Sequence, residues 1–309
     1  MEQSSNDPLV ENVAKISHTD VMDLLVLTIL IYDYGKTIAY KSNDTIEEFI
    51  SRSSENNVTT RGEGEGQESD KEPSKPLIKQ QAIERLLQNS PDGKIVDFIS
   101  DPDTDLQAGI TISEKNKRIT IIFRGSESTY DWYYDLKFIK TCIDKQKNVY
   151  VHGGFYKQLT HNKNHQRLTQ KIKELLETYP DYYVYTTGHS LGGALCTLYG
   201  YMLSHEIEQN VSVISFASPR VGNKGWKKSF DAKSNLIHYR ITNNNDIVTS
   251  FPTILYNHVG NNIRLERNNK ASFLYDYSYR WWEYSIFKCY SIRDHSCEEY
   301  YKYLSTNTW

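Results

Sequence analysis

Apolar positions along the chain follow a helical period in some stretches and form short unbroken runs in others. The run 24–32, LLVLTILIY, holds one threonine and predicts a buried helix that begins near Thr19 or Asp20 and is closed by Gly35. The stretch 156–179 predicts one amphipathic helix, whose apolar face is formed by Leu168, Ile172, Leu175 and Leu176.

From residue 106 onward, short apolar runs alternate with helical patterns. LQAGITIS and RITIIF, separated by EKNK, predict a β-hairpin over 106–123. Further strands are predicted at 182–187, 211–218 and 236–242. The first two of these strands flank a helix whose apolar side holds Leu191, Leu195, Leu198, Met202 and Leu203. This order predicts an α/β fold with a mostly parallel central sheet and helices on both of its faces.

One long polar stretch interrupts the N-terminal part of the chain. Residues 51–76, SRSSENNVTTRGEGEGQESDKEPSKP, hold almost no large apolar side chains, so burial cannot offset the entropy of ordering them. We predict a disordered insert at 51–76, after an N-terminal helical segment, 1–50, that packs on the main α/β domain, 77–309. Its GEGEG motif does not predict a phosphate loop, because glutamates lie between the glycines and no strand precedes it.

Composition and charge narrow the class of protein. The 309 residues carry a net charge of −3, which indicates no nucleic-acid partner. The N-terminus is polar and lacks the pattern of a signal peptide, and the longest apolar run is too short for a membrane helix. The four cysteines form no CxxC pair and are expected to be reduced thiols. We therefore expect a soluble protein of the cytoplasm or another intracellular compartment.

The hexapeptide GHSLGG, 188–193, places a serine between two glycines directly after a predicted strand and before a predicted helix. That context is typical of a nucleophile elbow, in which a tight turn exposes the serine hydroxyl at the carboxyl end of a sheet. Ser190 is then the candidate nucleophile, and the amide of Leu191 points to where an oxyanion would form. The alternative interpretation is a glycine-rich turn that happens to hold a serine.

A serine nucleophile needs a base and an acid, which follow it in chain order in hydrolases of this kind. Asp246 comes after the strand 236–242, where a loop at the carboxyl end of the sheet is expected, although it could instead cap an Asx turn. His295 and His258 are the candidate bases. His238 lies inside a predicted strand, and His189 is assigned to packing.

The segment HNKNH gives His161 and His165 the i, i+4 spacing of a zinc-binding helix. It lacks the glutamate of HExxH and has no apparent third ligand, so a solvated helix face is the preferred interpretation. We expect neither a metal nor a cofactor.

Four stretches, in order, resemble the class 3, or fungal-type, lipases: ITIIFRGSES, VHGGFY, TTGHSLGGAL, and SFASPRVGN followed by NNNDIVTSFP. The resemblance runs from about residue 106 to residue 300 and implies an α/β-hydrolase fold. Carried over residue by residue, it implies Ser190 as nucleophile, Asp246 as acid and His295 as base. Ser126 in FRGS would supply a second oxyanion amide beside that of Leu191. The spacing H-SCEE-Y departs from the family's usual His-x-x-Tyr, which keeps His258 as the alternative base.

The segment 127–138, ESTYDWYYDLKF, would then form a lid. Its aromatic side chains either contact substrate and lipid or pack in the core; they are Tyr130, Trp132, Tyr133 and Tyr134.

The function that these features imply is a serine hydrolase of lipid carboxyl esters, such as triacylglycerol, diacylglycerol or phospholipid. Any contact with a membrane or a lipid droplet is expected to be peripheral. Two alternatives stay open. One is an esterase for small soluble or feruloyl-type esters, and the other is a catalytically silent lipid-binding or interaction protein.

Overall fold

A nine-stranded sheet forms the centre of the protein. The computed structural model describes residues 16–32, 41, 43–51, 75–126, 139–243, 245–252, 254–266, 271–274 and 292–309. The strand order is β1-β2-β3-β4-β7-β8-β9-β10-β11, and β5 and β6 form a separate hairpin. The strands are β1 (Asp44–Thr45), β2 (Lys94–Asp101), β3 (Leu106–Ser113), β4 (Arg118–Phe123), β5 (Lys140–Asp144), β6 (Val149–His152), β7 (Tyr183–His189), β8 (Val211–Phe216), β9 (Leu236–Asn243), β10 (Asn261–Leu265) and β11 (Ala271–Leu274).

The middle of the sheet is parallel and its two edges are antiparallel. Strands β4, β7, β8, β9 and β10 pair in parallel, whereas β1, β2 and β3 on one side and β11 on the other pair antiparallel. The predicted hairpin is confirmed as β3 and β4, with Ala108 opposite Phe123. The predicted α/β fold with a parallel centre is confirmed, and antiparallel pairing is confined to the flanks.

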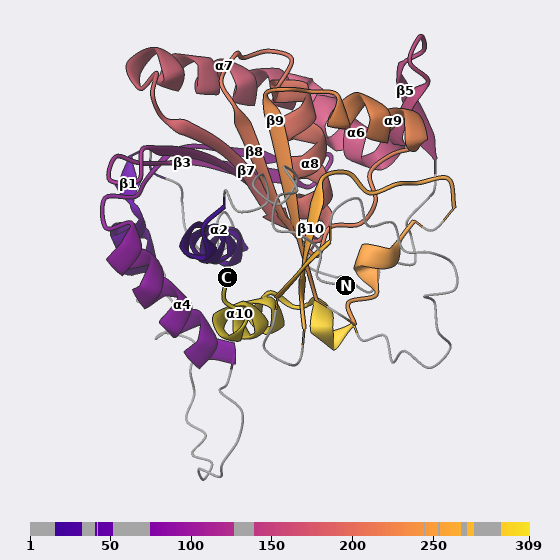
Figure 1. Ribbon diagram of the computed structural model, residues 1–309. Coiled ribbons are helices and arrows are strands. Elements are labelled where there is room, and N and C mark those ends of the chain that lie inside the picture. Colours follow the sequence, from indigo (N-terminus) through magenta and orange to yellow (C-terminus); the bar gives the residue numbers. More distant parts are fainter. Residues whose placement is uncertain are drawn as a thin grey trace, which may run out of the picture.

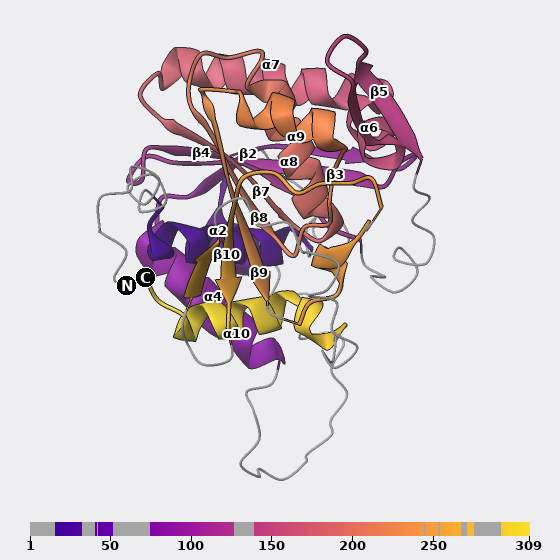
Figure 2. The ribbon, with the colours of Figure 1, turned by 45° about the vertical axis from the view of Figure 1, so that its right-hand side comes forward.

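Helices cover both faces of this sheet, as Figures 1 and 2 show. One face carries α6, α7, α8 and α9, and the other carries α2, α4 and α10. Their bounds are α2 (His18–Ile31), α4 (Lys75–Asn89), α6 (Gly153–Thr160), α7 (Asn164–Thr178), α8 (Leu191–Leu203), α9 (Lys224–Asp231) and α10 (Cys297–Thr306). Short 3₁₀ helices are η1 (His161–Lys163), η2 (Val248–Ser250) and η4 (Arg293–His295), and residues 46–51 form a further short helix.

Helix α2 is buried on all sides, which explains why its sequence is apolar without a polar face. Every residue from Val21 to Ile31 is buried between the sheet and the helices α4 and α10. The predicted helix is confirmed but begins slightly earlier than expected, because Ser17 is the N-cap and its hydroxyl accepts a hydrogen bond from the Asp20 amide at 3.0 Å.

The single helix predicted over 156–179 is wrong, because the chain breaks at η1. Asn162 and Lys163 adopt left-handed backbone angles there, with φ of 48° and 59°. The HNKNH segment is therefore not a solvated helix face. His161 and Asn164 both bind the carboxylate of Asp101 at the end of β2, at 2.8 and 2.6 Å, so the break is fixed by long-range hydrogen bonds.

Two predictions fall largely outside the described residues. Positions 52–74 of the predicted insert are not among them, and neither are the lid residues Tyr130, Trp132, Tyr133 and Tyr134. The insert, the lid and the division into 1–50, 51–76 and 77–309 therefore stay predictions. In the part of the chain that the structure describes, no helix combines the length and the apolar character needed to cross a membrane.

A buried ion pair joins α2 to the sheet. Arg118 of β4 is 3% exposed and lies 3.6 Å from the carboxylate of Asp23, which is 2% exposed. Asp23 also accepts a hydrogen bond from Asn89 of α4 at 3.0 Å. Burial is the main reason that the pKa of Asp23 is raised above its ordinary value, against the smaller lowering effects of Asn89 and Arg118.

We expect Arg118→Met to lower the free energy of unfolding at neutral pH by about 3 kcal/mol, because it leaves the Asp23 carboxylate buried without its cation. The raised pKa lets Asp23 take up a proton as the pH falls, so the loss shrinks toward acid pH. Urea unfolding of wild type and variant at several pH values measures this.

The adjacent variant Lys117→Met is the control, since its ion pair with Asp181 is exposed and we expect no measurable change. Equal stability of Arg118→Met and Lys117→Met would contradict the role given to the buried pair.

Candidate active site

Ser190 is the one residue between the end of β7 and the start of α8, and its backbone conformation is one that serine rarely adopts. Its φ is 58° and its ψ is −121°. Such a conformation costs on the order of 1–3 kcal/mol and persists only where surrounding contacts enforce it. Here the Ser190 amide donates to the Phe216 carbonyl at 3.0 Å, and the Ser190 carbonyl accepts from the Ala194 amide at 3.2 Å. The predicted strand–turn–helix context of Ser190 is present.

Two glycines make this turn sterically accessible. A Cβ at Gly192 would overlap the carbonyl oxygen of Phe123 at the end of β4. A Cβ at Gly188 would lie 2.8 Å from the same oxygen and would also overlap the backbone of Gly192. The first turn of α8 therefore packs directly on the end of β4. This close packing is possible only because residues 188 and 192 are glycines, which have no side chain.

The structure brings Ser190, His295 and Asp246 together in a buried chain of hydrogen bonds. His295 Nε2 lies 2.8 Å from Ser190 Oγ, and His295 Nδ1 lies 2.9 and 3.0 Å from the two carboxylate oxygens of Asp246. Each of the three residues is 1% exposed. Because a carboxylate only accepts, Nδ1 carries the proton, and Nε2 is left to accept the proton of the serine hydroxyl.

Two further donors hold the carboxylate of Asp246. The Val248 amide donates to Oδ1 at 2.9 Å, and the Tyr300 hydroxyl donates to Oδ2 at 2.7 Å. The Tyr300 oxygen in turn accepts from the Asn243 amide at 3.0 Å. The acid is thus fixed by β9, by the loop that follows it and by α10.

Sequence reasoning missed Tyr300, although the H-SCEE-Y spacing was a signal. That spacing was used only to question His295. On α10 it places a tyrosine five residues after the histidine, close enough to the base to reach the same carboxylate. Arg220 was missed as well: its guanidinium donates to the carbonyls of Ser250 and Pro252 and secures the loop after the acid.

The other candidate histidines are held elsewhere. His258 Nε2 donates to the Thr249 carbonyl at 2.7 Å, and His238 Nε2 lies 2.8 Å from the Ser215 hydroxyl. Burial is the main reason that the pKa of each is well below the ordinary value of histidine. The position next to Ser190 is therefore filled by His295 and not by the alternative base His258.

The two predicted oxyanion donors belong to segments that meet at the nucleophile elbow. Leu191 is the first residue of α8, where a backbone amide has no partner within the helix. Ser126 follows Gly125, whose Cα lies so close to residue 189 that a Cβ there would be 2.6 Å from the His189 carbonyl oxygen. The turn after β4 thus runs past the nucleophile elbow, where both amides can serve one developing oxyanion.

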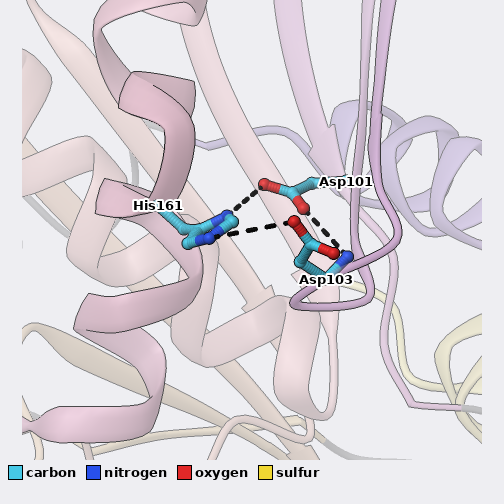
Figure 3. Close-up of side chains that lie close together, drawn as sticks. All are labelled: Asp101, Asp103 and His161. Atoms are coloured by element: carbon cyan, nitrogen blue, oxygen red, sulfur yellow. Dashed lines mark hydrogen bonds and ion pairs between the residues drawn. The ribbon is translucent and has the colours of Figure 1, made fainter.

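Among the described residues, one group of three side chains has the composition of a metal site. It consists of Asp101, Asp103 and His161, shown in Figure 3. Its central carboxylate is already used, because Asp101 accepts from His161 at 2.8 Å, from Asn164 at 2.6 Å and from the Asp103 amide at 3.1 Å. We assign this cluster to the junction between β2 and η1.

A buried serine bonded to a histidine that is itself oriented by a carboxylate can carry out acyl transfer through a covalent intermediate. A family model described as Lipase (class 3) matches residues 120–256, which include Ser190 and Asp246.

This stretch, fewer than half of the 309 residues, is similar to the class 3 lipase family.

Curated lipases are similar to part of this chain. The chain is 29% identical over 163 residues to the secreted mono- and diacylglycerol lipase A of Penicillium cyclopium, covering 53% of this chain and 52% of the relative. It is 31% identical over 152 residues to a lipase of Rhizomucor miehei, covering 48% and 41%. The chain thus spans about half the length of these curated relatives.

Solved structures extend the likeness beyond that stretch. A triacylglycerol lipase whose catalytic centre is formed by a serine protease triad is 26% identical, with a TM-score of 0.61 over 69% of this chain and 82% of that one. A mutant of the Penicillium cyclopium protein MDLA has a TM-score of 0.63 over 89% of this chain and 88% of its own, at 18% identity. The second likeness concerns the fold alone.

We expect Tyr300→Phe to slow covalent labelling of Ser190 by a fluorophosphonate about tenfold, because Asp246 loses one of the donors that orient it. The rate of labelling, followed by mass spectrometry, measures how strongly the serine is activated. Tyr303→Phe, on the same helix but partly exposed, is the control and should label at the rate of wild type. Equal rates for wild type and Tyr300→Phe would show that the hydroxyl does not act on the acid.

Proposed function

We propose that the protein is a class 3 lipase, a serine hydrolase of lipid carboxyl esters. The observation that carries the proposal is the unbroken chain of hydrogen bonds from Ser190 Oγ through His295 to Asp246, buried behind a strained elbow. The solved triacylglycerol lipase with a serine protease triad supports it.

In the proposed mechanism, Ser190 Oγ attacks the ester carbonyl carbon while His295 Nε2 accepts the hydroxyl proton. Asp246 holds the tautomer of His295 and stabilises the imidazolium that forms. The amides of Leu191 and Ser126 stabilise the oxyanion of the tetrahedral intermediate. His295 then protonates the leaving alcohol. A water molecule, deprotonated by the same nitrogen, hydrolyses the acyl-enzyme.

The substrate class rests on the relatives and on the surface near the site. The relatives include a mono- and diacylglycerol lipase, a triacylglycerol lipase and a phospholipase A(1), which favours lipid esters over small soluble or feruloyl-type esters. The intact hydrogen-bonded triad weighs against a catalytically silent lipid-binding protein. Intracellular location stays a proposal, and the free thiols of Cys142 and Cys196 agree with it.

Exposed aliphatic side chains next to the site support peripheral contact with a lipid surface. Ile254 and Leu255, in the loop after the acid, are 76% and 73% exposed, and Ile139 is 64% exposed. These segments meet, because the Lys140 amino group lies 4.7 Å from the centre of the Tyr256 ring. Exposed aliphatic side chains grouped in this way are typical of surfaces that bind lipid or a partner.

Hydrolysis of a panel of acylglycerols, phospholipids and short soluble esters tests the proposed reaction. We expect Ser190→Ala and His295→Ala each to lower kcat by about 10⁴-fold or more. His258→Asn should keep kcat within about tenfold of wild type, because the His258 ring donates to the Thr249 carbonyl and not to a member of the triad. Activity that survives in Ser190→Ala, or that is lost in His258→Asn and kept in His295→Ala, would refute the assignment.

The double variant Ile254→Ser with Leu255→Ser tests the lipid surface. We expect activity on emulsified triacylglycerol to fall about tenfold, because less apolar area enters the interface, while the rate on a soluble ester is unchanged. Tyr183→Ser is the matched control, since Tyr183 is 64% exposed at the opposite end of β7 from Ser190. A parallel loss on both kinds of substrate would contradict a surface role.

A further inference from the structure

His189, directly before the nucleophile, makes two side-chain hydrogen bonds that join separate parts of the site. Its Nε2 lies 2.6 Å from the carbonyl oxygen of His295, and its Nδ1 lies 3.1 Å from the hydroxyl of Tyr32 at the end of α2. His189 is 4% exposed, and the centres of the His189 and His295 rings are 4.7 Å apart. The sequence interpretation of His189 as plain packing was therefore wrong.

The direction of both hydrogen bonds follows from the groups involved. A backbone carbonyl only accepts, so Nε2 of His189 carries the proton and donates it to the His295 carbonyl. In the neutral ring Nδ1 is then an acceptor, and the Tyr32 hydroxyl must be its donor. These two bonds fit a neutral His189 with one fixed tautomer, and burial, which holds the pKa of His189 well below its ordinary value, favours that neutral form.

The contacts continue to the turn after β4. Gly125 packs against the Tyr32 hydroxyl so closely that a Cβ there would overlap it. Gly125 precedes Ser126, the proposed oxyanion donor. The Tyr32 hydroxyl therefore contacts the oxyanion turn and donates to His189, whose Nε2 donates to the backbone of the base, so three separate segments meet at one buried imidazole.

We propose that His189 is a positioning residue, a neutral bridge that holds the backbone of His295 and the oxyanion turn at Gly125 in place around Ser190. This rests on the proposed hydrolase function and adds a residue to it, since His189 acts through His295 and Gly125 and not on the substrate.

The electrostatic surroundings agree with a neutral bridge. Burial is the main reason that the pKa of His189 is well below its ordinary value, and the nearby His295 lowers it further. Burial also raises the pKa of Tyr32 well above its ordinary value, so its hydroxyl keeps the proton that it donates. The titratable and charged groups that face this chain are His295, Tyr300, Asp246, Arg124, Cys297 and Glu298.

Tyr32→Phe tests the bridge, because it removes one hydroxyl and keeps the ring. We expect kcat per active site, counted by fluorophosphonate labelling, to fall about tenfold while KM stays within about twofold. Loss of the donor to Nδ1 removes a bond that favours the neutral ring, so the pKa of His189 rises. A charged His189 would disable the adjacent base. We therefore expect the fall of kcat/KM on the acid side of the pH profile to occur about half a pH unit higher than in wild type.

A second measurement does not depend on hydrolysis. In ¹⁵N-histidine NMR spectra, with the His189 signals assigned from a His189→Gln variant, wild-type His189 should stay in the Nε2–H tautomer from about pH 5 to 9. In Tyr32→Phe it should begin to titrate within this range. If the protein hydrolyses no ester, the proposed function fails, and this spectrum alone still decides whether the bridge exists.

Tyr199→Phe is the matched control, because its buried hydroxyl binds Thr169, away from the triad. It should match wild type in kcat, pH profile and spectrum. The proposal is overturned if Tyr32→Phe behaves like Tyr199→Phe, if its loss of activity only follows a loss of labelled sites, or if His189 titrates in the wild-type protein.

Discussion

The contact between the first turn of α8 and the end of β4 is the constraint on which the rest of the site depends. Gly192 and Gly188 lie against the Phe123 carbonyl so closely that no side chain fits at either position. This contact enforces the left-handed backbone of Ser190 and directs its hydroxyl out of the turn. It also brings the turn after β4, which holds Gly125 and Ser126, close to the backbone of the nucleophile elbow.

The base and the acid reach that point from the other end of the chain. Asp246 follows β9 and His295 precedes α10, and Tyr300 joins them through the carboxylate. Helix α10 also packs on α2, which carries Tyr32 at its end. The face of the sheet formed by α2, α4 and α10 therefore does more than bury apolar surface. It fixes the C-terminal half of the triad against the elbow through hydrogen bonds that are buried or partly buried.

Apolar runs and helical periods in the sequence predicted the features that depend on neighbouring residues. The apolar run before GHSLGG and the helical period after it were enough to place Ser190 at a strand–turn–helix junction. The position of Asp246 followed from its place after a parallel strand. The residues alone left His258 and His295 open and only the family resemblance favoured His295, because the choice depends on how η4 docks on the sheet.

The same limit explains the residues that were missed. Tyr300 binds a carboxylate 54 positions away, and His189 binds a backbone carbonyl 106 positions away. Neither contact leaves a periodic signal in the sequence. The break at η1 was missed because the helical pattern continues through HNKNH, while the hydrogen bonds to Asp101 that end α6 come from β2.

A crystal structure of the protein inactivated by a fluorophosphonate tests the account most directly. The account predicts a bond from phosphorus to Ser190 Oγ and a phosphoryl oxygen within hydrogen-bond distance of the Leu191 and Ser126 amides. It also predicts that His295 Nδ1 remains on Asp246. An adduct on another residue, or a phosphoryl oxygen that faces away from both amides, would contradict the claim that this elbow is a catalytic centre.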